Sequence, residues 1–183
     1  MKGFWAKGSL RRNTAAVAAL GLLLCAAHDA SAEGGSYFSK VMELLGRKDL
    51  SVAEDFQLTE VTRGMPVRLN DYRGKRPVLL YFWAIWCPAC QSVKKELAEF
   101  RRKTPEERLE ILAINVGSGD SLDRLERYQK AHPVPFPVLY DDGSRVTESY
   151  GVQGIPLFVL VDRNGRIVYR DHTLPDNYVE YLD

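Results

Sequence analysis

A continuous apolar run that leads into a pair of cysteines constrains this chain more than any other feature. Residues 77–84 read Pro-Val-Leu-Leu-Tyr-Phe-Trp-Ala and carry no charge. A strand that is apolar at every position is buried on both faces, which is typical of a sheet covered by helices. A helix is expected next, because apolar residues recur there at helical spacing, at Cys90, Val93, Leu97 and Phe100. The run therefore predicts an α/β fold with a cysteine pair, Cys87 and Cys90, at a strand-to-helix turn.

The rest of the pattern predicts one alternating α/β domain without an internal repeat. Apolar runs of strand length alternate with segments of helical periodicity, and turn residues separate them. Asp120 is a candidate N-cap, and Thr104-Pro105 is expected to end the helix that follows the cysteines. We expect a hairpin at 55–69 around Gly64, strands at 77–84, 109–116, 137–140, 157–161 and 166–170, and helices at 120–128, 145–150 and 177–182.

The first 32 residues have the features of a secretory signal peptide. Four basic residues come first, and residues 14–27 then form an uncharged, mostly apolar stretch, shorter than the roughly 20 residues of a spanning helix. Ala30-Ser31-Ala32 supplies a cleavage pattern of small residues. We therefore predict a signal at 1–32, a mature start at Glu33 and a periplasmic or otherwise extracytoplasmic protein. An uncleaved membrane anchor and a lipid on Cys25 are the alternatives.

Composition and cysteine count narrow the class of the mature protein. The chain is 45% hydrophobic and 27% charged, which is typical of a globular protein. With 25 basic and 24 acidic residues the net charge is +1, so no nucleic-acid partner is expected. Removal of the signal leaves two cysteines, too few for a disulfide framework. We expect a lead-in segment at 33–54 and one domain at 55–183.

The chemistry is expected at Trp86-Cys87-Pro88-Ala89-Cys90. Cys87 would lie at a helix N-terminus, where free N–H groups and the helix dipole stabilise a thiolate. Pro88 suits the first helical turn, and Cys90 lies three residues on, close enough for a disulfide. Cys87 is then the exposed nucleophile and Cys90 the resolving thiol. Half of a zinc site and a purely structural disulfide are the alternatives.

Six segments between residues 55 and 170, roughly, match a known pattern: Phe56-x-Leu58, the stretch from Val67 to Lys75, Phe82-Trp83-Ala84-x-Trp86-Cys87, Phe136 to Asp141, Tyr150-Gly151-Val152-x-Gly154-Ile155-Pro156 and Leu160 to Gly165. Together they resemble the TlpA/ResA-like branch of the thioredoxin fold, a family of exported thiol–disulfide oxidoreductases. This resemblance implies a thioredoxin-like fold in which a central mixed sheet is flanked by helices and extended by an N-terminal hairpin.

The resemblance also implies site residues, partners and a cellular role. Ile155-Pro156 would be a cis peptide facing the cysteines, and Trp86, Ile155 and Pro156 would bind the substrate. The substrates would be protein thiols and disulfides, and a membrane electron donor would recharge the pair. The protein would then be a reductant in cytochrome c maturation or in periplasmic thiol maintenance, without a cofactor or a metal.

Three departures from the family pattern keep other functions open. Tyr81 and Pro88 stand where related proteins carry a carboxylate, and Leu157 stands where the family often has Thr. The alternatives are a copper-chaperone-like metal-binding module, a peroxiredoxin-like antioxidant enzyme and a non-catalytic domain with a structural disulfide.

Overall fold

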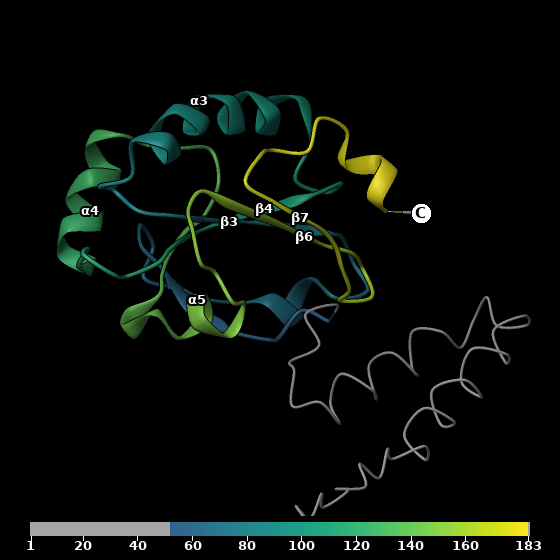
Figure 1. Cartoon of the computed structure of the whole chain (residues 1–183), viewed down its shortest axis with the longest axis horizontal. Coiled ribbons are helices and arrows are strands. Elements are labelled where there is room, and N and C mark those ends of the chain that lie inside the picture. The colour runs from purple at the N-terminus through teal and green to yellow at the C-terminus, as the bar shows by residue number, and fades with distance from the viewer. Residues whose placement is uncertain (1–51, 183) are drawn as a thin grey trace, which may run out of the picture. The chain divides into compact units, whose positions relative to one another are not determined.

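The computed structural model describes residues 52–182, which form a seven-stranded mixed sheet with helices on both faces (Figure 1). The strand order is β2-β1-β5-β4-β3-β6-β7. The strands are β1 (Gln57–Glu60), β2 (Pro66–Arg68), β3 (Val78–Trp83), β4 (Glu110–Asn115), β5 (Val138–Tyr140), β6 (Leu157–Val161) and β7 (Ile167–Asp171). The α-helices are α3 (Pro88–Lys103), α4 (Leu122–Ala131) and α5 (Arg145–Ser149).

Strand β3 lies at the centre of the sheet, as its apolar run predicts. All six of its residues are buried, and it pairs in parallel with β4 and antiparallel with β6. Its side chains alternate between the two faces. Tyr81 and Trp83 point toward α3 and α4, whereas Phe82 packs against Tyr150 at the end of α5. The cysteine pair therefore follows a rigid strand that is packed on both sides.

The N-terminal hairpin extends the sheet beyond its thioredoxin-like centre. β1 and β2 pair antiparallel around Gly64, and β1 also pairs antiparallel with β5. At the other edge, β6 and β7 pair antiparallel across the turn at residues 162–166. This mixed sheet, flanked by helices and carrying a hairpin, is the fold class that the sequence indicates.

Two details of the helices differ from the sequence-based expectations. Ser121 rather than Asp120 caps α4, and its hydroxyl accepts a hydrogen bond from the Arg124 N–H. On α3 the fully covered positions are Cys90, Lys94 and Leu97, whereas Val93 and Phe100 are only partly buried. The apolar spacing placed the helix correctly but missed Lys94, because a lysine does not register as a core residue.

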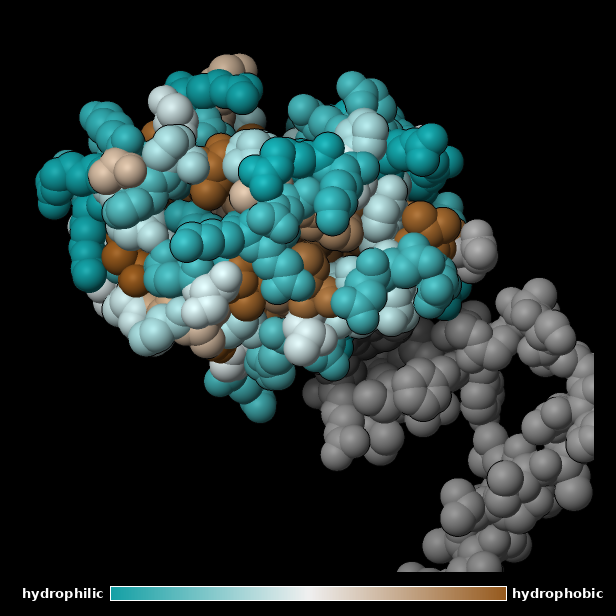
Figure 2. All heavy atoms as spheres, turned by 90° about the horizontal axis from the view of Figure 1, so that it is seen from above, coloured by the Kyte–Doolittle hydropathy of each residue, from teal (hydrophilic) through white to brown (hydrophobic). Residues whose placement is uncertain are grey.

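The chain ends in a short 3-10 helix, η3 (Tyr178–Tyr181), where a terminal helix is expected. The signal at 1–32 and all but the last three residues of the lead-in at 33–54 lie outside the described residues. No helix among residues 52–182 has the length and apolar character that crossing a membrane requires. The face in Figure 2 is largely hydrophilic, with small hydrophobic patches between the polar side chains.

Candidate active site

The cysteine pair forms the first turn of α3. Cys87 is the N-cap, with extended backbone angles, and Pro88 takes the first helical position. The Cys87 Sγ accepts a hydrogen bond from the Cys90 N–H at 3.1 Å. A disulfide joins Cys87 to Cys90, and their Cα atoms are 5.3 Å apart. The first sulfur thus lies at the positive end of the helix, where free N–H groups favour a thiolate once the disulfide is reduced.

The two cysteines differ little in exposure, contrary to the expectation of an exposed Cys87. Cys87 is 4% exposed and Cys90 is fully buried. The cover over Cys87 comes partly from the loop before β6, where the Ile155 carbonyl oxygen lies 3.8 Å from the Cys87 Sγ. Local sequence patterns could not indicate this cover, because the loop lies 68 residues further along the chain, although the family resemblance implied that Ile155-Pro156 faces the cysteines.

The loop before β6 brings the expected docking residues to the disulfide. The Ile155–Pro156 peptide bond is cis, as the resemblance implies. Ile155 is half-buried and Pro156 is buried at the start of β6. The carbonyl of Ile155 therefore lies against Cys87, although the two residues are far apart in sequence.

Trp86 lies beside the pair and is held from the loop after β4. Its indole N–H donates to the Ser118 carbonyl at 2.8 Å, while 51% of the residue stays exposed. A side chain at Gly119 would collide with the indole nitrogen, at 2.9 Å from the ideal Cβ position. Asp120 supports the same turn, because its carboxylate accepts the Ile85 N–H at 2.9 Å. The loop after β4 thus fixes the turn that carries Trp86 and Cys87.

Two further side chains lie at the site that sequence reasoning did not place there. Lys94 is 8% exposed, and its Nζ lies 4.5 Å from the ring centroids of both Trp83 and Tyr128. The His172 Nδ1 lies 2.6 Å from the Pro156 carbonyl oxygen. The spacing of Lys94, four residues after Cys90, could have indicated its face. The hairpin register of β6 and β7 could have indicated His172, because Phe158 pairs with Asp171.

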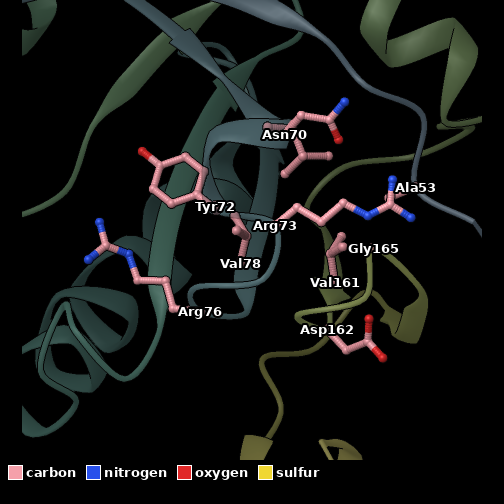
Figure 3. Close-up of a pocket in the computed structure, with 10 residues that line it drawn as sticks. Ala53, Asn70, Tyr72, Arg73, Arg76, Val78, Val161, Asp162 and Gly165 are labelled. Carbon is pink, nitrogen blue, oxygen red and sulfur yellow. The ribbon is translucent and has the colours of Figure 1, made fainter.

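Other parts of the described structure offer neither a metal-binding cluster nor an open binding site at the small cavity described next. Among residues 52–182 no cluster of three or more His, Cys, Asp or Glu side chains could hold a metal ion. A small cavity of about 10 Å³ lies at the far end of the sheet, between the first residue of β3 and the last of β6 (Figure 3). Arg73 extends across it and donates to the Asn164 carbonyl oxygen at 2.8 and 3.1 Å. These contacts hold the β6–β7 turn in place, so we assign Arg73 a structural role.

Comparisons with known proteins agree with this geometry. A family model described as the AhpC/TSA family matches residues 51–170. The chain is 35% identical over 117 residues to the thiol-disulfide oxidoreductase ResA of Geobacillus thermodenitrificans, covering 64% of this chain and 65% of that protein. It is 30% identical over 147 residues to the thiol-disulfide oxidoreductase ResA of Bacillus thuringiensis, covering 80% of each.

A solved structure is similar as well. The pneumococcal exposed lipoprotein thioredoxin Etrx1 from Streptococcus pneumoniae superposes with a TM-score of 0.60 and 28% identity, over 67% of this chain and 92% of that one. The chain spans 65% of the length of the Geobacillus relative, slightly less than two thirds. The chain therefore belongs to the AhpC/TSA family, among its ResA-like members.

Proposed function

We propose that the protein is a thiol–disulfide oxidoreductase that exchanges disulfides with protein substrates through Cys87 and Cys90. The observation that carries the proposal is the disulfide at the N-terminus of α3, with the Ile155 carbonyl 3.8 Å from its first sulfur. A purely structural disulfide would close only a four-residue loop and would stabilise the fold little. The ResA-like relatives, which are named for this activity, support the same proposal.

In the reducing direction, the exchange takes two steps. The Cys87 thiolate attacks one sulfur of a substrate disulfide, so that a Cys87–substrate bond forms while the substrate S–S bond breaks and its other sulfur leaves as a thiolate. The Cys90 thiolate then attacks the Cys87 sulfur. This forms the Cys87–Cys90 disulfide and releases the second substrate thiol. Two electrons pass from the cysteine pair to the substrate. We propose that an exported, membrane-linked dithiol donor then reduces the Cys87–Cys90 disulfide again.

Substrate docking would use Trp86 and the backbone at Ile155-Pro156. An extended substrate segment would pair with the backbone at Ile155, and pairing through the backbone tolerates many sequences. The exposed face of Trp86 would supply apolar contact on the other side of Cys87. Backbone pairing of this kind fits a protein with several partners.

We further propose that the mature protein is exported and starts at Glu33, with residues 33–54 as a lead-in and 55–183 as the working domain. The positive and apolar stretches of residues 1–32 support this proposal. In such a compartment a cysteine pair can cycle between disulfide and dithiol. A reductive role in cytochrome c maturation or periplasmic thiol maintenance follows from the family resemblance alone.

Trapping of mixed disulfides tests the proposal. Cys90→Ala should accumulate covalent complexes with substrate proteins, because the resolving step is lost. Dithiothreitol should separate these complexes by reducing the mixed disulfide. Cys87→Ala should accumulate few complexes and lose insulin reduction. Non-reducing electrophoresis and mass spectrometry are the measurements. Wild-type protein that leaves insulin oxidised in the presence of a dithiol donor would contradict the activity, and trapping by Cys87→Ala instead would reverse the two roles.

A further inference from the structure

Lys94 is a buried cation on the helix that begins at the cysteine pair. It lies one helical turn after Cys90 on the covered face of α3. Side chains on a helix lean toward its N-terminus, and positions four apart are neighbours, so Lys94 and Cys90 occupy the same face of α3. Its Nζ is held between the Trp83 ring on β3 and the Tyr128 ring on α4, at 4.5 Å from each.

The Lys94 ammonium has no anionic or hydrogen-bonding partner among the described residues. Its Nζ is shielded from solvent and makes no hydrogen bond within residues 52–182. The Trp83 ring on β3 and the Tyr128 ring on α4 face it directly. Tyr81 stacks beside Trp83, His132 and Gln91 contact Tyr128, and Cys90 is buried on the same face of α3. None of these is an anion near neutral pH. Burial alone lowers the Lys94 pKa, to about 8.

Reduction of the disulfide creates a thiolate, which supplies the anionic partner that the Lys94 ammonium does not have among the described residues of the oxidised protein. The Cys87–Cys90 disulfide is neutral, whereas the reduced pair carries a thiolate at the helix N-terminus. The ring contacts of Lys94 provide part of its stabilisation, because the faces of Trp and Tyr rings attract cations. A thiolate on Cys87, about two helical turns from Lys94, adds attraction through a medium of lower dielectric than water.

We propose that Lys94 is a positioning residue whose buried ammonium stabilises the thiolate of the reduced cysteine pair. This inference rests on the proposed function, since it assigns Lys94 a part in the redox cycle of Cys87 and Cys90. A cation that favours the reduced form makes the pair a stronger oxidant, because the reduction potential rises with the stability of the dithiol state. Lys94 thereby sets the thiol pKa and the redox equilibrium without touching the substrate.

Lys94→Met provides the decisive variant, and Lys95→Met is its matched control. Met has a similar length without the charge, and Lys95 is exposed on the same helix. Alkylation of the reduced proteins as a function of pH measures the thiol pKa, and equilibration with glutathione measures the redox equilibrium. For Lys94→Met we expect the pKa of the more reactive thiol to rise by about one unit. The equilibrium should shift about tenfold toward the disulfide, which corresponds to about 30 mV. Lys94→Gln should behave like Lys94→Met, which guards against a fold defect in one variant.

The outcomes separate this inference from the proposed function, because the thiol titration does not require turnover. If the wild type reduces insulin but Lys94→Met and Lys94→Gln leave the pKa and the equilibrium within twofold of it, the role of Lys94 is wrong and the activity stands. An equal shift in Lys95→Met would also overturn it, since any nearby charge would then suffice. If the wild type does not reduce insulin while the Lys94 variants still raise the thiol pKa, the role of Lys94 is supported and the proposed oxidoreductase function is contradicted.

Discussion

Tyr81 fills the position beneath the helix where related proteins place a carboxylate. Its hydroxyl donates to the Cys90 carbonyl at 2.8 Å, and its ring stacks between Trp83 and Phe158. Burial raises the Tyr81 pKa well above its usual range. Tyr81 therefore stays protonated near neutral pH and holds the start of α3, whereas a carboxylate could exchange a proton with the thiols.

Lys94 should make the stability of the oxidised protein depend on alkaline pH. Burial lowers its pKa from 10.5 to about 8 in the folded state, so between these values the unfolded chain binds more protons than the folded one. Stability therefore rises with pH across that window, and the full penalty of about 3 kcal/mol remains below it. Lys94→Met should accordingly unfold at a higher denaturant concentration than the wild type at neutral pH, and the gap should shrink by pH 10.

Guanidinium denaturation of the oxidised proteins at several pH values measures this gap. Lys95→Met serves as the reference, because its exposed ammonium should give a gap near zero at every pH. A constant difference between the wild type and Lys94→Met from neutral to alkaline pH would contradict the expected window.

At the scale of elements, the connections on the carboxyl side of the strands organise the site. The loop from β4 into α4 holds Trp86 through Ser118 and the Ile85 N–H through Asp120. Gly117 lets this loop pass the β5–α5 connection, because its φ is +73° and an added Cβ would lie 2.1 Å from the Asp141 carbonyl oxygen. A glycine at position 117 is therefore needed for the close approach of these two connections.

Asp141 fixes the start of α5, and its removal should loosen that helix. Its buried carboxylate accepts the Val146 N–H at 3.1 Å and both the N–H and the hydroxyl of Thr147 at 2.7 Å. Asp141→Ala leaves these donors without the carboxylate, so we expect a loss of about 2 kcal/mol in the free energy of unfolding. Urea denaturation measures it, with the exposed neighbour Asp142→Ala as control. Equal stability of the two variants would show that the carboxylate does not hold α5.

At the scale of the whole molecule, the redox site and the main buried ion pairs lie at opposite ends of the sheet. Cys87 follows the carboxyl end of β3, whereas Glu110 begins β4 beside Val78, the first residue of β3. The Glu110 carboxylate is 2% exposed and lies 3.0 Å from Arg76 and 3.7 Å from Arg101. Burial raises its pKa, against the lowering effect of the two arginines and the Ile111 N–H. Stability and redox chemistry can therefore be changed separately.

Glu110→Ala should destabilise the fold without altering the cysteine pair. Removing one partner of a buried ion pair leaves the other charges uncompensated, which costs about 3 kcal/mol. Glu106→Ala removes an exposed carboxylate, 3.5 Å from Arg76, and should cost less than about 0.5 kcal/mol. Thermal unfolding measures the first effect, and insulin reduction well below the melting temperature should stay unchanged. A large loss of activity in folded Glu110→Ala would contradict this separation.

The sequence by itself determined most of the architecture. The fully apolar run of β3 indicated a buried strand, the turn at Gly64 indicated the hairpin, and alternating periods located the remaining strands and α3. These signals are local, since backbone propensity and burial pattern act over a few residues. The cysteine pair is equally local, because Cys87 and Cys90 lie within the first turn of one helix. The cis bond before Pro156 was predicted from family resemblance.

Only the tertiary structure decided what surrounds the cysteines. The Ile155 carbonyl covers Cys87, the His172 ring meets the Pro156 carbonyl, and Lys94 enters the space between Trp83 and Tyr128. Each contact joins different elements, so it depends on strand order, hairpin register and the packing of α3 against α4. A charged residue on a covered helix face also contradicts the hydrophobic pattern that locates the helix. Its burial is decided by neighbours that the linear sequence does not place together.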